Sequence, residues 1–531
     1  MPSLVILLGC LALTLVLLAQ AQRVNDTTFF SQARISGDVS AAEEDYTCSK
    51  TKGCALGCCG QLDPKTGLGV CGLGPTFCGE GCVSTCHYKS ECDPGWGIEW
   101  SNASTCPLNV CCSEFGFCGT TPGFCGGKVV ASPECGSGSR TSDAITIGYY
   151  EGWNMAQRSC NTMKPSEIPL GYYTHIFYSF ALIDPKTFHV ADMDAEVGSH
   201  YDAVAALKNK QPGLQVWIAI GGWAMNDPGP WRTAFSDMAR STASQDAFFQ
   251  SLVSFLALHD FDGVDLDWEY PVAEDRGGVP EDFENYVTMI SRLRMALNAS
   301  GKRYGLSITL PASYWYLRGF DLQKIEPHLD FFNVMTYDIH GVWDKTVNSI
   351  GPYAFAHTNL TEIQIGLELL WRNNINPARV NLGLGFYGWS FTMKDPNCMS
   401  AGCEFTDGAK GGECTGTPGV LSVAEINKII KNGGKVTYDA AAAVKIVTWD
   451  TDQWVSFDDV ETLKIKQDYA NRRCLGGTMV WAIDLDDGSM INALGSNLNR
   501  PKAVVAEDVV GWKWDQGYNP GVAQRRKREE L

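Results

Sequence analysis

From Ala144 onward, short apolar runs alternate with stretches of helical periodicity. The helical stretches, such as 246–260 and 285–299, place apolar residues three and four positions apart. The strand-like runs are ITIGYY (145–150), HIFYSFAL (175–182), LQVWIAIGG (214–222), FDGVDLDWEY (261–270), RYGLSITL (303–310), DFFNVMTYD (330–338), RVNLGLGFYG (379–388) and GGTMVWAIDL (476–485). Eight strands separated by helices predict an α/β fold, a (β/α)8 TIM barrel. An open doubly wound sheet is the alternative, but it would carry a Gly-rich phosphate loop after its first strand.

The seventh strand is followed by an unusually long connection before the next helical stretch, 461–473. This connection contains a further strand-like run, KIVTWD (445–450). It predicts a small α+β domain, inserted at about 392–454 on the loop face of the barrel, where it would form one wall of a groove. We expect the barrel domain as a whole to span 144–499.

The N-terminal part is rich in cysteine and glycine: 15 of the 21 cysteines lie between Cys48 and Cys135. They form two similar modules, 48–86 and 92–135, each with a double cysteine and then a Cys-Gly pair six residues before the next cysteine. Modules of about 40 residues cannot bury a sufficient core, so disulfides must hold them. Zinc binding is the alternative, which the irregular spacing opposes.

The first residues have the pattern of a secretory signal peptide. An apolar run from Leu4 to Leu18 precedes the small residues of Ala19-Gln20-Ala21, although the usual basic residue before the run is missing. We therefore predict a signal peptide (1–21), a flexible leader (22–47) and a soluble, secreted protein. N-glycosylation fits that compartment, and the acceptor triplets begin at Asn25, Asn102, Asn298 and Asn359.

The net charge of −18 argues against nucleic acid and anionic membranes as partners. No other stretch is long and apolar enough for a transmembrane helix. The polar tail, 500–531, ends in Arg-Glu-Glu-Leu, which faintly resembles an endoplasmic-reticulum retrieval signal. We interpret it instead as a solvated tail.

The run FDGVDLDWEY carries the most distinctive chemistry. Its alternation places Asp265, Asp267 and Glu269 on one face, and Val264, Leu266 and Trp268 would face the helices. Side chains on one face of a strand recur every two residues, so the three carboxyls crowd within about 14 Å. Crowded carboxyls raise one another's pKa, which provides the protonated acid that glycosidic cleavage needs. A calcium site or a salt-bridge network is the alternative, but no basic residue is interleaved.

Four motifs resemble family 18 chitinases. The signature D-G-x-D-x-D-x-E corresponds to Asp262, Gly263, Asp265, Asp267 and Glu269. AIGGW (219–223) is similar to the third-strand motif with Ala219 for the usual Ser, MTYD (335–338) to the sixth-strand motif, and MVWAID (479–484) to the eighth. With its cysteine-rich modules, the chain most resembles killer-toxin-like fungal chitinases that carry hevein-type (type 1) chitin-binding modules.

This resemblance implies retaining, substrate-assisted hydrolysis of chitin, in which the substrate's N-acetyl oxygen replaces a nucleophilic carboxylate. Glu269 would be the proton donor, Asp267 would orient the acetamido group, and Asp265 would share the proton of Asp267. Tyr337 would hydrogen-bond the acetamido oxygen, and Asp338 would hold the distorted sugar. The implied substrate-binding residues are Gly221, Gly222, Trp223, Tyr270, Met335, Tyr337, Asp338 and Trp481, with Trp481 as the floor of the −1 subsite. We assign four other tryptophans to the core: Trp153, Trp315, Trp343 and Trp389.

In hevein-type modules one serine and three aromatics contact chitin. The second module matches these positions with Ser113, Phe115, Phe117 and Phe124. The resemblance also implies disulfides Cys92–Cys112, Cys106–Cys118 and Cys111–Cys125, which leaves Cys135, for which we expect Cys160 as the partner. The first module has Gly60 for the serine and Val70 for an aromatic, and keeps only Phe77, which predicts a structural role or weakened binding.

The leading hypothesis is therefore a secreted, monomeric chitinase whose partners are chitin and chitooligosaccharides and which needs no cofactor or metal. One alternative is a catalytically inactive chitin-binding lectin or toxin-docking subunit. A second is an endo-β-N-acetylglucosaminidase acting on N-glycans, which the chitin-binding module opposes.

Overall fold

This computed structural model describes residues 46–500 and Lys502. The predicted signal peptide (1–21) and nearly all of the predicted leader (22–47) and tail (500–531) lie outside these residues. Within the described part of the chain, no helix has the length and apolar composition needed to cross a membrane.

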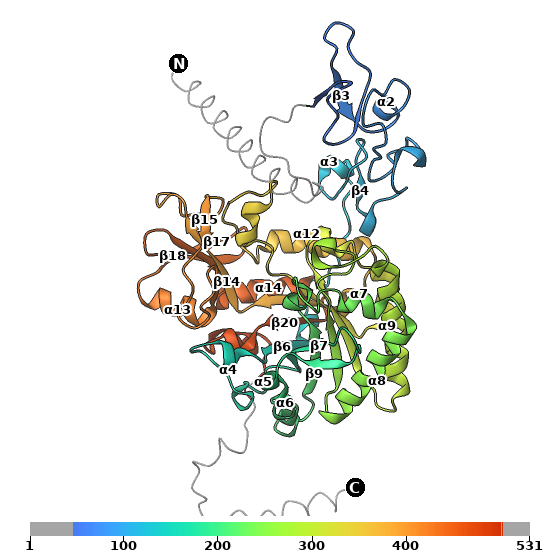
Figure 1. The fold of residues 1–531 in the computed structure, drawn as a ribbon. Coiled ribbons are helices and arrows are strands. Elements are labelled where there is room, and N and C mark those ends of the chain that lie inside the picture. Colours follow the sequence, from blue (N-terminus) through green and yellow to red (C-terminus); the bar gives the residue numbers. More distant parts are fainter. Residues whose placement is uncertain (1–45, 501, 503–531) are drawn as a thin grey trace, which may run out of the picture.

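Eight parallel strands close into a ring, which confirms the predicted barrel (Figure 1). In chain order they are β6 (Ile145–Glu151), β7 (His175–Ile183), β9 (Gln215–Gly221), β10 (Gly263–Asp267), β11 (Gly305–Pro311), β12 (Phe331–Met335), β13 (Val380–Gly385) and β20 (Gly477–Trp481). The ring closes where β6 pairs with β7, and a short strand, β8 (Val190–Asp192), pairs antiparallel with β7 outside it.

Helices surround the ring, and polar side chains begin several of them. Asp459 accepts hydrogen bonds from the backbone N–H of Glu461 and Thr462, and Asn359 accepts one from Thr361, so each caps a helix start. The helices are α4 (Asn154–Gln157), α5 (Ala195–Gly198), α6 (Tyr201–Ala205), α7 (Ala234–Ala239), α8 (Thr242–Leu258), α9 (Asp282–Ala299), α10 (Tyr314–Leu317), α11 (Leu322–Ile325), α12 (Leu360–Arg372), α14 (Val460–Arg472) and α15 (Ser489–Asn497).

Bulky apolar side chains fill the lower interior of the barrel. The ring of Trp217 lies where side chains at Gly263 and Gly305 would otherwise project, and it stacks on Phe177 and Phe331 at centroid distances of 5.1 and 5.3 Å. Since the N-terminal half of the barrel is packed shut, only the C-terminal ends of the strands are left to form a site.

The insertion is an antiparallel sheet with one helix and is wider than the predicted 392–454. Its strands are β14 (Tyr387–Met393), β15 (Phe405–Gly408), β16 (Val420–Ser422), β17 (Lys435–Asp439), β18 (Val444–Trp449) and β19 (Gln453–Phe457), and its helix is α13 (Val423–Lys431). The sequence prediction missed both ends because β14 continues almost directly from the barrel strand β13 and β19 leads directly into α14.

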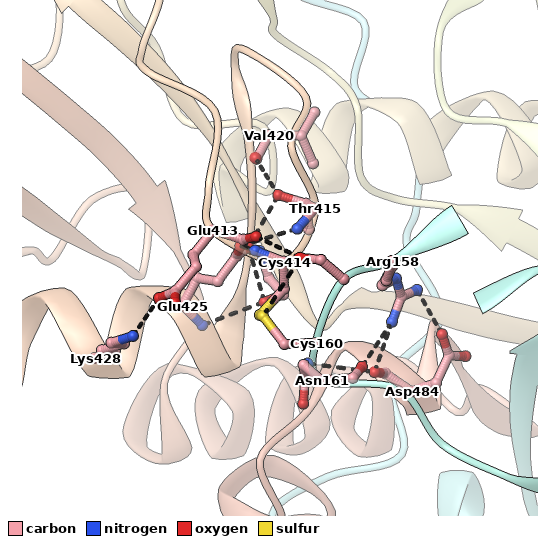
Figure 2. The surroundings of a disulfide bond; sticks show 12 residues. Arg158, Cys160, Asn161, Glu413, Cys414, Thr415, Val420, Glu425, Lys428 and Asp484 are labelled. Carbon is pink, nitrogen blue, oxygen red and sulfur yellow. Dashed lines mark hydrogen bonds and ion pairs between the residues drawn. A yellow bond between two sulfur atoms is a disulfide. The ribbon is translucent and has the colours of Figure 1, made fainter. Parts of the chain in front are cut away.

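A disulfide between Cys160 and Cys414 ties the insertion to the loop after β6 (Figure 2). Beside it, the Ser159 hydroxyl donates to the carbonyl oxygen of Glu413 over 2.7 Å. On the barrel side, Arg158 forms a buried ion pair with Glu151, the last residue of β6. It forms another with Asp484, in the short turn Ile483–Leu485 after β20 (Figure 2). The insertion is thus fastened to the barrel rim rather than free to swing.

The two cysteine-rich modules share one disulfide connectivity. In each, the first cysteine pairs with the fourth, the second with the fifth and the third with the sixth; the bonds are Cys48–Cys59, Cys54–Cys71, Cys58–Cys78, Cys92–Cys112, Cys106–Cys118 and Cys111–Cys125. Their short elements are β1 (Thr47–Cys48), β2 (Cys58–Cys59), β3 (Gly69–Gly72), α2 (Pro75–Cys78), β4 (Cys111–Cys112), β5 (Cys118–Gly119) and α3 (Pro122–Cys125). Every cysteine of the described residues is in a disulfide, so the clustered thiols are not available to zinc.

The second module is docked on the outside of the barrel, beside α12 (Figure 1). Asn373, at the end of that helix, accepts a hydrogen bond from Asn109 over 3.0 Å and donates one to the carbonyl oxygen of Leu108. Cys135 pairs with Cys474, just before β20, so the expected bond to Cys160 is wrong. Sequence spacing cannot specify such long-range pairings.

Candidate active site

The acidic strand places two carboxyls inside the barrel and a third just beyond it. Asp265 and Asp267 lie in β10, and Glu269 follows two residues after the strand ends, so the predicted strand 261–270 is too long at both ends. All three side chains are buried. Asp262 belongs to the opposite end of the barrel, where it pairs with Lys208 over 3.1 Å.

Asp265, the deepest of the three, is surrounded by hydrogen-bond donors. It accepts from the hydroxyls of Tyr149 (2.7 Å) and Ser307 (2.5 Å) and from the amide of Asn333 (3.1 Å). Burial raises the pKa of Asp265 to about 6, although these three hydrogen bonds lower it. Ala219 pairs in register with Asp265, so the serine hydroxyl missing at 219 is replaced by donors from other strands.

The pKa values of Asp267 and Glu269 are also raised. Burial, with the carboxylates of Glu269 and Asp265, raises the pKa of Asp267 well above its usual range, and the Thr309 hydroxyl donates to it. Burial raises the pKa of Glu269 to about 7. A carboxylic acid with such a pKa can donate a proton near neutral pH and can accept one later.

The insertion supplies two partners to the predicted rim residue Asp338. The Tyr387 hydroxyl donates to Asp338 Oδ1, and the Trp389 indole N–H donates to the same oxygen over 2.7 Å. Asp338 has a left-handed backbone conformation with φ of 56°, which turns the chain at the strand's end. Beside it, Tyr337 is buried, and its ring lies 6.1 Å from that of Tyr387.

Trp481 is half-buried at the end of β20, within an aromatic cluster. Its ring stacks on Phe180 at 5.6 Å and lies 5.5 Å from Tyr149 and 6.3 Å from Trp153. Trp153 is half-buried and packs against the hydrophobic core from within this cluster, so its predicted core placement holds in part. Tyr149 links this cluster to the carboxyls, since its hydroxyl is the one bound to Asp265.

Core placement is wrong for Trp343, whereas Trp389 is half-buried and packs against the core. Trp343 is exposed, and its ring meets that of Trp389 edge to face at 4.7 Å. Periodicity could not distinguish Trp343 from a core residue, because an aromatic that lines a groove follows the same strand or helix pattern.

The glycines of the third-strand motif serve the fold. A β-carbon on Gly221 would lie 2.1 Å from the carbonyl oxygen of Asp267, and one on Gly222 would meet the ring of Phe180 at 2.4 Å. The space beside them is therefore taken by protein atoms. That Gly221 and Gly222 contact the substrate stays a prediction.

Other predicted binding residues also lie close to the carboxyls. Trp223 is 50% exposed, and Tyr270 is buried and stacks on Tyr316 at 4.3 Å. Met335 is half-buried at the end of β12. The end of the barrel therefore combines a buried acid with an aromatic surface, which is what hydrolysis of a sugar polymer requires.

A family model described as glycosyl hydrolases family 18 matches residues 145–486, which is most of the barrel. The chain belongs to glycosyl hydrolases family 18. A second model, described as chitin recognition protein, matches residues 97–137, which cover most of the second module. Family 18 and a chitin recognition module thus occur together in one chain.

The chain is similar to proteins of two fungi. It is 28% identical to "Secreted chitinase LysM12" of Penicillium expansum over 73% of this chain and 27% of that protein. It is 35% identical to "Killer toxin subunits alpha/beta" of Kluyveromyces lactis over 64% of this chain and 29% of that protein. These relatives place the chain in the killer-toxin-like group, and the chain spans under a third of the length of each.

Solved structures show the same barrel. Catalytic domain 2 of the group II chitinase of Ostrinia furnacalis aligns over 68% of this chain and 99% of its own, with a TM-score of 0.60 and 27% identity. Human YKL-39, described as a pseudo-chitinase with retained chitooligosaccharide binding, aligns over 67% of this chain and 100% of its own. At 24% identity and a TM-score of 0.60, YKL-39 shows the family 18 fold alone.

In the second module, three of the residues predicted to contact chitin, Ser113, Phe115 and Phe117, share one turn, and the fourth, Phe124, lies on α3. Ser113 is buried, and its hydroxyl accepts the backbone N–H of Phe117 over 3.1 Å. Phe115 is 64% exposed, and the ring of Phe124 lies over Gly119. Docking on α12 uses Leu108 and Asn109 instead, so it leaves this turn at the surface.

The first module keeps the turn but not its chemistry. The Gly60 N–H donates to the Val70 carbonyl, as the Ser113 N–H donates to that of Phe117 in the second module. Val70 is exposed where the second module has an aromatic. A structural role or weakened binding stays the prediction for this module.

Several site residues were not predicted from the sequence. Tyr149, Ser307, Thr309 and Asn333 lie on three strands, β6, β11 and β12, and each looked like an isolated polar residue in an apolar run. Tyr387 and Trp389 belong to an unrecognised strand, β14. The available signal was strand parity: Ser307 and Thr309 lie two residues apart on β11, on one face, as Asp265 and Asp267 do on β10.

Proposed function

We propose that this protein is a secreted chitinase that cleaves β-1,4 bonds between N-acetylglucosamine units by retaining, substrate-assisted hydrolysis. Glu269 donates its proton to the glycosidic oxygen while the bond from that oxygen to the anomeric carbon breaks. The N-acetyl oxygen of the same sugar attacks the anomeric carbon and takes the place of a protein nucleophile. Asp267 accepts the acetamido N–H and stabilises the positive charge that develops on that group.

The second step uses the same carboxyl in its ionised form. Glu269 removes a proton from water, the water oxygen bonds to the anomeric carbon, and the bond to the N-acetyl oxygen breaks. Two displacements on one carbon retain its configuration. Tyr337 hydrogen-bonds the acetamido oxygen, and Asp338 holds the distorted sugar above Trp481.

The observation that supports this proposal most is the environment of Glu269. The pKa of Glu269 is raised to about 7. Of the three carboxyls Asp265, Asp267 and Glu269, it is also the one nearest the C-terminal end of the barrel. A buried carboxyl whose only role is structural is normally satisfied by several donors, as Asp265 is. Ser113, Phe115, Phe117 and Phe124 would bind chitin, so that the second module brings the barrel to its substrate.

Three parts of the chain complete the proposal. Residues 1–21 act as a signal peptide, 22–47 as a leader and 500–531 as a polar tail, and the protein acts as a monomer. The modules span 48–86 and 92–135, and the barrel domain spans 144–499.

The test is product analysis with the purified protein on colloidal chitin and on chitohexaose. We expect shorter chitooligosaccharides whose new reducing ends are first formed as the β-anomer, followed by proton NMR. If chitin is bound and no bond is cleaved, the inactive lectin is the correct function; α-anomers would overturn the retaining mechanism.

A further inference from the structure

The guanidinium of Arg276 joins three segments around the proton donor. Arg276 ends the short turn Glu274–Arg276 and is buried. Its Nε donates to the main-chain oxygen of Glu269 over 3.1 Å, and its Nη2 donates to the main-chain oxygen of Trp223. Its Nη1 pairs with the carboxylate of Asp227 over 2.8 Å.

Arg276 also supports the ring of Trp223. Its Cζ lies 3.6 Å from the centroid of the indole, a cation–π contact on one face of the ring. Since Trp223 is nevertheless half exposed, the rest of its surface is open to solvent. An indole backed by a buried cation and open on its other side is suited to stack on the C–H face of a sugar.

The turn does not need this guanidinium for its shape. The Asn226 side-chain amide donates to the main-chain oxygens of Arg232 and Arg276, and the Gly278 N–H donates to that of Ala273. Arg232 donates to the main-chain oxygen of Asp275 over 2.8 Å. Burying a cation costs free energy unless its partners are well placed. Because other hydrogen bonds hold the turn, the contacts of Arg276 with Glu269 and Trp223 indicate a role other than shaping the turn.

We propose that Arg276 is a positioning residue that couples the proton donor Glu269 to Trp223, the sugar platform beside it. A sugar that stacks on Trp223 holds the indole against the guanidinium, and the guanidinium holds the main chain of Glu269 in its donating position. The inference rests on the proposed function, because Glu269 is a proton donor only if the chain hydrolyses glycosidic bonds.

The positive charge of Arg276 also acts on the pKa of the proton donor, Glu269. The groups that act on the Glu269 carboxyl include the Tyr270 hydroxyl and the carboxylates of Asp338, Asp227 and Asp267. Arg276 lowers the pKa of Glu269 against those carboxylates. Its removal therefore leaves Glu269 protonated to higher pH, and the basic limb of the pH–rate profile moves upward.

The experiment measures kcat/KM on chitohexaose between pH 4 and pH 9 for the full chain and three variants. Arg276→Met loses the cation, Arg276→Lys keeps the charge but cannot reach three acceptors, and Arg232→Met is the control that touches only the turn. We expect Arg276→Met to lower kcat/KM by about tenfold and to shift the basic limb upward. Arg276→Lys should keep the limb in place and recover part of the rate, and Arg232→Met should stay within about twofold.

A double-mutant cycle tests the coupling itself. Trp223→Ala should cost less in the Arg276→Met background than in the wild type, because both changes remove the same contact. If Arg276→Met does not fold, as judged by its melting curve, the cycle with Arg276→Lys decides.

If the two substitutions lower kcat/KM independently, so that their fold-effects multiply, the inference is overturned. A pH–rate profile of Arg276→Met equal to that of Arg232→Met would overturn it as well. Either result leaves the proposed function intact. If the wild type cleaves no chitohexaose, the proposed function fails, and the inference fails with it.

Discussion

The indole N–H of Trp389 donates a hydrogen bond to Asp338 over 2.7 Å and so joins the insertion to the rim of the barrel. Trp389 lies on β14, which also carries Tyr387, the second donor to the same carboxylate oxygen. The insertion therefore does more than form one wall of a groove. It also orients Asp338, which the proposed mechanism places against the sugar.

Trp389→Phe should therefore weaken the grip on substrate while the fold is kept. A hydrogen bond to a charged group contributes about 1.5–3 kcal/mol, so kcat/KM on chitohexaose should fall by roughly tenfold, mainly through KM. Tyr438→Phe is the matched control, since Tyr438 is exposed on the outer strand β17 of the same sheet. Equal kinetics for the two variants would show that Asp338 does not need the indole.

The sequence predicted the acidic strand β10 well because its signal is local. Acids at the alternate positions 265, 267 and 269 share one face of a strand, and within a barrel that face points to the interior. The eight strands were predicted from the apolar runs. The partners of Asp265 could not be predicted in this way, because Tyr149, Ser307 and Asn333 come together only when three other strands close the ring. Each is 26 to 184 residues from another member of the set.

The long-range disulfides could not be predicted from the sequence either. Cys135–Cys474 and Cys160–Cys414 join residues 339 and 254 positions apart, and the number of alternative pairings grows steeply with the number of cysteines. For the second module, the resemblance to hevein-type modules implied three pairs, and the structure forms the same three.

The stability of the barrel should depend on pH through Glu269. Folded Glu269 releases its proton near pH 7 and an unfolded glutamate near pH 4.5, so the folded state holds the extra proton between these values. The free energy of unfolding therefore falls as pH rises through this window. Glu269→Gln removes the titration, so its melting temperature should exceed that of the wild type by about 2 °C or more at pH 8 and match it at pH 4.

Calorimetry at the two pH values measures this difference. Glu196→Gln is a suitable control, because Glu196 is exposed and lies outside the site. A Glu269→Gln protein with the same melting difference from wild type at both pH values would contradict a raised pKa for Glu269.

Phe115 should contribute most of the module's affinity for chitin. Its ring is 64% exposed, so Phe115→Ala removes a stacking surface without opening the module's core. Loss of one aromatic stack should weaken binding to insoluble chitin by about tenfold. Val129→Ala, at an apolar side chain that is 89% exposed on the same module, should bind like the wild type in a pull-down on chitin beads. Equal binding by the two variants would exclude Phe115 from the binding surface.

The disulfide Cys135–Cys474 should keep the linker between module and barrel closed to proteases. Glu134 pairs with Arg473 over 2.9 Å beside this bond, and Ser142 binds Asn471 further along the linker. In the variant Cys135→Ser/Cys474→Ser, limited proteolysis within 126–143 should become several-fold faster, because local opening of the linker controls cleavage. Hydrolysis of soluble chitohexaose should stay within about twofold. Unchanged cleavage rates would mean that docking on α12 alone holds the linker.

The role of Glu269 is the central claim, and Glu269→Gln tests it most directly on chitohexaose and insoluble chitin. The amide keeps the shape of the side chain but cannot act as the acid. We expect hydrolysis to fall by at least about 10³-fold and chitin binding to remain. Near-normal cleavage by this variant would contradict the assignment of Glu269 as the proton donor.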